Sequence, residues 1–193
     1  MDGILQKLLT EIPDYQEFLT AAELDESTRR LAREHPESVS LLEIGRTREG
    51  RALLCLQIGG GERNALLFGC PHPNEPIGAM LLEYFSRSLA ENAALREALG
   101  YTWYIVKAWD ADGLVKNEGW LKGPFNIYQY TRNFFRPAGV AQVDWTFPAD
   151  YKRLHFHDVL PETQAMMELI DRIRPAFIYA LHNTGFGGTY WYE

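Results

Sequence analysis

The sequence predicts an α/β fold of three layers (α/β/α), in which helices cover both faces of a mixed, mostly parallel twisted sheet. Short apolar runs of strand length alternate with segments whose apolar residues recur at helical spacing. The first two runs, 39–44 and 51–58, flank a tight turn and predict an antiparallel hairpin. The later runs are joined through helical segments, and right-handed crossovers of this kind make their strands parallel neighbours.

Helices and strands can be assigned in order along the first half of the chain. Residues 1–35 are expected to be helical, with Asp25 or Ser27 as a helix cap and Pro36 as the stop. The continuous apolar run at 65–68 is typical of a strand buried on both faces. A helix follows at 77–90. We expect its buried stripe to consist of Ile77, Met80, Leu81, Tyr84, Phe85 and Leu89.

The second half of the chain predicts two more strands and one more helix. The strand at 102–109 ends at Asp110, and a long aromatic-rich loop then runs to Leu160. A helix over 161–174 begins with proline, whose missing N–H is harmless in the first turn. The run at 176–181 is predicted to be another buried strand. In such sheets ligands gather outside the carboxyl ends of the strands.

Length and composition predict one soluble domain, residues 1–193, with N-terminal helices at 1–35 and an α/β core at 36–193. The chain is 46% hydrophobic and 23% charged, which is enough apolar material for a core. Its net charge of −7 and the lack of a Lys/Arg cluster argue against a nucleic-acid partner.

The cellular setting is predicted from three negative observations. Two cysteines, Cys55 and Cys70, are too few for a disulfide framework and suit a reducing, cytoplasmic location. The first ten residues alternate apolar and polar types, so we expect no secretory signal. No run approaches the ~20 apolar residues of a membrane span, so we expect no membrane partner.

Two histidines and one glutamate follow predicted strands. His72 and Glu75 lie three positions apart after the run at 65–68, and His182 comes directly after the run at 176–181. This is a zinc ligand set, and three protein ligands leave a fourth position open for water, as in catalytic sites. The alternative is an exposed loop with satisfied side chains and a histidine that is only the polar end of a strand.

The remaining histidines, His35, His155 and His157, are interpreted as surface or loop-packing residues. A position near the cleft stays open for His155 and His157.

Three further segments carry motifs in a fixed order: residues 44–53, 110–113 and 161–165, the last followed by Leu181-His182. They resemble the Ile-Gly-x-Ser-x-Glu-Gly-Arg-x-Leu hairpin, the Asn-Pro-Asp-Gly segment, and the Pro-Glu-x-x-Ala helix with its Leu-His of the zinc metallocarboxypeptidases, the family of carboxypeptidase A. The resemblance runs from about residue 24 to the last residue. It implies a hydrolase that cleaves a terminal amide or peptide bond with a zinc-activated water.

The resemblance also implies roles for single residues. His72, Glu75 and His182 would be the ligands of Zn²⁺. Arg132 or Arg136 would stabilise the oxyanion that forms on the substrate.

Substrate binding is expected to involve Asn133, Trp145 and Thr146. Trp145 and Thr146 depart from the family, which has an Asn-Arg-Asn in the matching stretch that grips the substrate's terminal carboxylate. Neither side chain can imitate that bidentate contact. We therefore expect a different grip on the substrate.

The family's general-base glutamate and a tyrosine that covers the substrate lie well beyond the third ligand, past Glu193. The chain is thus expected to resemble the amino-terminal half of the hydrolase, incomplete at its C-terminus and nearly inactive alone. Expected partners are a peptide or acyl-amino-acid substrate, and either a second copy or a C-terminal segment that covers the open sheet, with residues 190–192 in that contact.

Two alternative functions remain. One is a zinc amidohydrolase of the aspartoacylase kind, which acts on N-acyl amino acids and whose His-Gly-Asn-Glu loop is similar to residues 72–75. The other is a non-catalytic metal-binding or interaction remnant of the fold.

Overall fold

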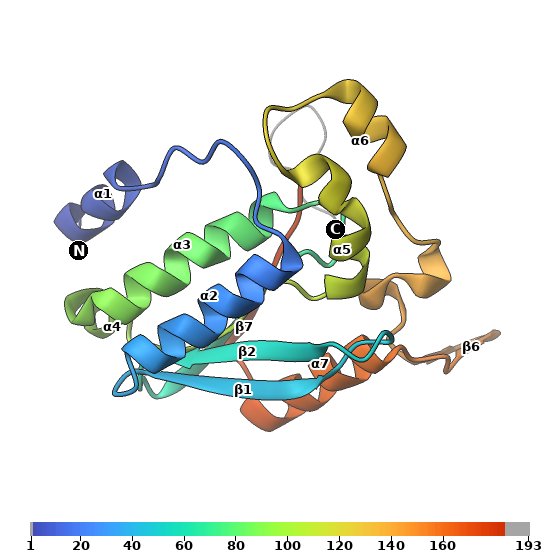
Figure 1. Cartoon of the computed structure of the whole chain (residues 1–193). Helices are drawn as coiled ribbons and strands as arrows, with labels where there is room; N and C mark the ends of the chain where they lie inside the picture. Colours follow the sequence, from blue (N-terminus) through green and yellow to red (C-terminus); the bar gives the residue numbers. More distant parts are fainter. Residues whose placement is uncertain (1, 184–193) are drawn as a thin grey trace.

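A mixed five-stranded sheet of order β1-β2-β4-β3-β7 forms the centre of the computed structural model, which describes residues 2–183 (Figure 1). β1 (Val39–Arg46) pairs antiparallel with β2 (Ala52–Ile58), and β2 pairs antiparallel with β4 (Tyr101–Val106). β4 lies parallel to β3 (Arg63–Gly69), and β3 lies parallel to β7 (Phe177–Leu181). The predicted mixed sheet is confirmed, with its parallel pairings confined to β4, β3 and β7.

Helices cover both faces of this sheet, as predicted. α2 (Ala21–Glu34) and α3 (Ile77–Glu91) lie over one face, and α7 (Pro161–Ile173) lies over the other (Figure 1). The interior strand β3 explains why both faces need cover, because its successive side chains point to opposite faces of the sheet. Leu67 packs in the core on the α2 and α3 side, whereas Leu66 packs in the core on the α7 side.

The N-terminal helices begin at other residues than predicted. α1 (Asp2–Thr10) is separated from α2 by a stretch without regular structure. The cap of α2 is Thr20, whose hydroxyl accepts from the backbone N–H of Glu23 at 3.2 Å, while the Glu23 carboxylate accepts from the N–H of Thr20 at 2.7 Å. The caps expected at Asp25 or Ser27 were wrong, because the Thr-x-x-Glu capping box begins at Thr20, ahead of both residues.

The stripe expected on α3 is wrong at two positions. Ile77 and Leu81 are exposed, while Leu82 is fully buried. The buried face of α3 also includes Glu83, which pairs with Lys107. A purely apolar stripe does not describe the buried face of α3, because that face also contains the charged side chain of Glu83.

The long loop expected between the strand at 102–109 and Leu160 contains regular structure. These elements are α5 (Ala111–Leu121), α6 (Ile127–Asn133), two 3₁₀ turns (Gly139–Ala141 and Val143–Trp145) and the hairpin of β5 (Ala149–Tyr151) and β6 (Leu154–Phe156). A short helix, α4 (Ala93–Leu99), also precedes β4. α5 has a weak sequence signal because it contains Gly113 and Gly119. Tertiary packing requires the first of them, since a Cβ at Gly113 would lie 2.6 Å from Pro73.

The expectation that the last strand is buried was wrong. Phe177, Ile178 and Tyr179 on β7 are exposed, Tyr179 to 58%. Among the described residues β7 pairs only with β3, so it is an edge strand with both faces partly open. The contact expected for residues 190–192 lies outside the described residues. Within residues 2–183, none of the helices is both long and apolar enough to span a bilayer.

Asp110, the N-cap of α5, is a buried carboxylate with an incomplete set of partners. Its Oδ1 accepts from the backbone N–H of Gly113 at 3.0 Å and lies 3.5 Å from Arg48 Nη2. Its Oδ2 is buried and, within residues 2–183, has no hydrogen-bond partner. Burial raises the pKa of Asp110 from 3.8 to about 6. The raised pKa means that the folded state favours the protonated carboxyl, so stability is lost as the pH rises from about 4 through 6.

We expect Asp110→Asn to stabilise the protein at pH 7, by up to about 3 kcal/mol, because the amide keeps the cap acceptor without a buried charge. The gain should shrink towards pH 4, and urea unfolding between pH 4 and 8 measures it. Asp112→Asn is the matched control, because Asp112 accepts from Thr47 and Glu49 and pairs with Arg51. That variant should lose stability. A less stable Asp110→Asn at pH 7 would mean that the Arg48 contact outweighs burial.

Candidate metal centre

The sheet register brings the two distant segments of the site together. Gly69 at the end of β3 pairs with Leu181 at the end of β7. Because the strands are parallel, the loop after Gly69 and the residue after Leu181 leave the sheet at the same edge. His182 therefore lies beside the loop that carries His72 and Glu75.

The conformation of that loop is set by its contacts with the rest of the fold. Cys70 has a left-handed φ of 47°, and its carbonyl accepts from the N–H of Asp110 at 2.9 Å. Burial raises the pKa of Cys70 to about 12, so its thiol stays protonated and packs as a small hydrophobe. Gly78 allows the start of α3 to approach β7, since a Cβ there would lie 2.7 Å from Leu181 Cβ.

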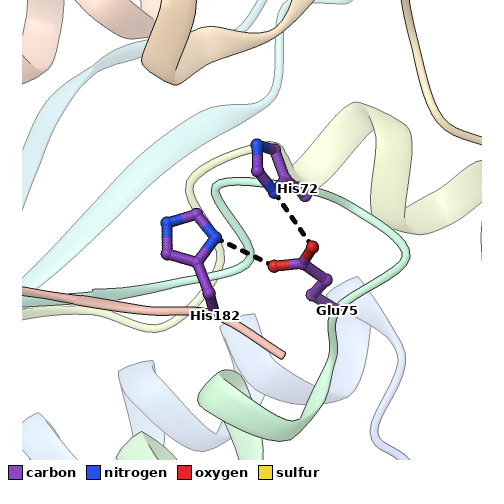
Figure 2. Close-up of side chains that lie close together, drawn as sticks. All are labelled: His72, Glu75 and His182. Atoms are coloured by element: carbon purple, nitrogen blue, oxygen red, sulfur yellow. Dashed lines mark hydrogen bonds and ion pairs between the residues drawn. The ribbon is translucent and has the colours of Figure 1, made fainter. Parts of the chain in front are cut away.

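Glu75 lies between the two imidazoles (Figure 2). Its Oε1 is 3.0 Å from His72 Nδ1 and its Oε2 is 2.9 Å from His182 Nδ1. The two imidazole rings are 4.7 Å apart between centroids, and one ligand atom from each of the three residues lies within 4.8 Å of the others. The structure thus brings together the three residues that the sequence put forward as ligands.

Asp144 is part of the same cluster, and the sequence analysis did not propose it. Its Oδ2 lies 2.9 Å from His72 Nε2, an ion-pair distance whose angle falls short of a regular hydrogen bond. The signal was present, because Val143-Asp144 keeps the frame of the family motif. A carboxylate on the outer nitrogen of a ligating histidine fixes the ring orientation and raises its basicity.

The charges of the cluster are strongly coupled. Burial lowers the pKa of His72, but the neighbouring carboxylates of Asp144 and Glu75 outweigh it and raise that pKa to about 9. Burial raises the pKa of Glu75, but His182 and His72 outweigh it and lower that pKa to about 2. Glu75 is therefore a carboxylate at any ordinary pH.

One of the two candidate arginines contacts the cluster. Arg136 Nη1 lies 3.1 Å from Glu75 Oε1, and its Nη2 donates to Gln142 Oε1 at 3.2 Å. Arg132 lies on the exposed helix α6, and within residues 2–183 it makes no hydrogen bond or ion pair with the cluster. Of the two candidate arginines, Arg136 is therefore the one whose side chain contacts the cluster.

The three residues expected to bind substrate lie in different environments. Trp145 is largely exposed and follows Asp144 directly. Thr146 is fully buried, and its hydroxyl lies 2.6 Å from that of Thr163. The amide of Asn133 donates to the backbone carbonyl of Gln129 at 2.9 Å. Of the three side chains, that of Trp145 is the one that is largely exposed and next in sequence to a residue of the cluster.

The residues present fit a zinc ion. Two imidazoles and one carboxylate match a common three-ligand set for catalytic zinc. Ligand distances of about 2.0–2.2 Å place tetrahedral donors about 3.4 Å apart, so small side-chain rotations close the set. Asp144 and Arg136 supply the surrounding contacts that orient such ligands.

Comparison with known proteins gives a consistent result. The family model described as zinc carboxypeptidase matches residues 24–193. Zinc carboxypeptidase A 1 of Anopheles gambiae is 30% identical over 126 residues, which are 58% of this chain and 29% of that protein. Mast cell carboxypeptidase A of Rattus norvegicus is 29% identical over 107 residues, which are 49% of this chain and 26% of that protein.

Solved structures show the same fold. Carboxypeptidase A from Helicoverpa armigera matches 95% of this chain and 52% of its own, with a TM-score of 0.69 and 18% identity. Murein-tripeptide amidase from Escherichia coli O157 matches 75% of this chain and 60% of its own, with a TM-score of 0.50 and 17% identity. The chain therefore spans about half the length of the first structure and less than a third of the curated relatives.

Proposed function

Because the chain belongs to the zinc carboxypeptidase family, we propose that this protein is a zinc-dependent hydrolase that cleaves a terminal peptide or peptide-like amide bond. The observation that carries the proposal is the convergence of His72, Glu75 and His182, with ligand atoms within 4.8 Å of one another. Family membership at this level leaves the substrate open, since both carboxypeptidases and an amidase share the fold.

Each residue of the cluster has a distinct task in this proposal. A bound zinc ion supplies Lewis acidity at the scissile carbonyl and lowers the pKa of water to about 7. Asp144 holds the His72 ring in place through its outer nitrogen. Arg136, whose guanidinium already reaches Glu75 Oε1, is placed to donate to the oxyanion of the substrate.

Proton transfer requires a further group. Within residues 2–183 the carboxylates that contact the two histidines are Glu75 and Asp144, and both are engaged by the imidazoles. A positioned acid or base contributes about 10²–10⁴-fold to such reactions. We therefore propose that the acid or base is a group other than Glu75 and Asp144, and that the assay should use the longest natural form of the protein.

The test follows release of the last amino acid from a blocked peptide by mass spectrometry. We expect release to be lost with a chelator and restored by zinc. Arg136→Ala should lower kcat about 10²–10³-fold with zinc binding unchanged, because a transition-state donor is lost. Arg132→Ala, on the exposed helix α6, is the comparison variant and should change kcat little.

Other outcomes identify the alternatives. Cleavage of N-acyl amino acids without peptide cleavage would favour the aspartoacylase kind of reaction. Zinc binding without either activity in the longest natural form would favour a metal-binding remnant. Equal losses of kcat in Arg132→Ala and Arg136→Ala would contradict the role given to Arg136.

A further inference from the structure

The β5–β6 hairpin carries a second group of metal-ligating side chains, separate from the Glu75 cluster. Its two strands pair only with each other in the described part of the chain, and the hairpin projects away from the helices (Figure 1). Asp150 on β5 lies directly opposite His155 on β6 in the register. His155 Nδ1 is 2.8 Å and His157 Nε2 is 3.2 Å from the same oxygen, Asp150 Oδ1.

Strand geometry explains this arrangement. His155 lies on β6, and His157 follows the last residue of that strand, with its Nε2 3.2 Å from the carboxylate that faces His155. A directly opposed cross-strand pair has its Cβ atoms about 4.5–5.5 Å apart, which brings the Asp150 carboxylate within reach of both rings. All three side chains are more than half exposed, so both rings are free to turn toward an ion shared with Asp150.

The turn of the hairpin carries two cations, Lys152 and Arg153, and the first is held over an aromatic ring. The nearby Lys152 lies over the ring of Tyr151, with its Nζ 4.8 Å from the ring centroid. Tyr151 follows Asp150 along the strand and therefore points to the opposite face. Asp158, which follows His157 in the sequence, is exposed.

We propose that Asp150, His155 and His157 bind one divalent transition-metal ion, such as Ni²⁺ or Zn²⁺, and that this ion orders the hairpin. Imidazole nitrogen with one carboxylate oxygen is a donor set that suits these ions and not Mg²⁺ or Ca²⁺. Each strand has three residues, and an isolated two-stranded hairpin is only marginally stable in water. An ion that binds only the closed hairpin therefore favours the closed form by mass action.

The first measurement is a Ni²⁺ titration by calorimetry. Wild type should bind two equivalents, one at each site, and His155→Ala/His157→Ala should bind one. In a His72→Ala background the remaining equivalent should disappear when His155 and His157 are also replaced. His35→Ala is the control, because His35 lies at the end of α2, where its ring is 3.9 Å from Glu37. This variant should bind the same number of Ni²⁺ equivalents as wild type.

The second measurement is limited trypsin digestion, because Lys152 and Arg153 form the turn of this hairpin. At ten times the dissociation constant, Ni²⁺ should slow cleavage after these residues about tenfold in wild type. It should have no effect in His155→Ala/His157→Ala. The proposal is overturned if that variant keeps both equivalents of Ni²⁺, or if Ni²⁺ leaves cleavage of the wild-type turn unchanged.

Discussion

His72→Ala is expected to abolish stoichiometric zinc binding at the Glu75 cluster. The substitution removes one of three ligands and also leaves Asp144, 2.9 Å from the lost ring, without its histidine. The measurement is equilibrium dialysis followed by metal analysis, against a chelator that keeps free zinc low enough for exposed sites such as the hairpin to stay empty. Wild type should retain close to one equivalent and the variant almost none.

A graded comparison separates ligand loss from general damage to the fold. Asp144→Asn keeps all three ligands and removes only the negative charge beside Nε2 of His72, so zinc affinity should fall about 10–100-fold. Both variants should unfold cooperatively, which circular dichroism checks. If His72→Ala retains a full equivalent under these conditions, the cluster is not the zinc site.

Lys107→Met is expected to destabilise the fold by about 3–5 kcal/mol. Lys107 Nζ lies 2.6 Å from Glu83 Oε2, and both side chains are almost completely buried. Glu83 Oε1 also accepts from Ser27 Oγ at 2.6 Å and from Arg87 at 3.0 Å. These contacts join α2, α3 and the end of β4, so loss of the lysine leaves a buried carboxylate with too few partners. Urea unfolding at pH 7 measures the effect.

The direction of the pKa shifts supports this expectation. Burial lowers the pKa of Lys107 despite the charge of Glu83 beside it. Burial raises the pKa of Glu83, but Lys107 and Ser27 outweigh that effect and lower it overall. The double variant Glu83→Leu/Lys107→Met should recover most of the lost stability, because apolar pairs replace buried ion pairs well. A single variant that loses less than about 1 kcal/mol would show that Glu83 is well satisfied without Lys107.

The sequence was informative about the site because a simple rule of parallel sheets applies. A continuous apolar run predicts a strand, and the next residues must leave a parallel sheet at its carboxyl edge. That reasoning placed His72, Glu75 and His182 at one edge, and the structure brings them together. The family resemblance left Arg132 and Arg136 open, and the contact with Glu75 distinguishes Arg136 only in three dimensions.

The features that could not be predicted depend on contacts between distant segments. α5 contains two glycines, and its place against Pro73 is visible only in three dimensions. The burial of Glu83 depends on Lys107, 24 positions away. The exposure of β7 depends on its position at the edge of the sheet, which an apolar run does not reveal. The role of Asp144 depends on its contact with His72, a residue of a segment far away in the sequence.

The left-handed backbone at Cys70 has a consequence for the thermodynamics of ion binding. The bend is held by the N–H of Asp110, the N-cap of α5, and by the packing of Cys70 among residues of α2, α3 and α5, none of which is a proposed ligand. The loop therefore loses its conformational entropy when the chain folds, before any ion binds. A receptor organised in advance keeps more of its gross interaction energy as affinity. In this respect the centre differs from small zinc domains, in which the ion itself drives folding.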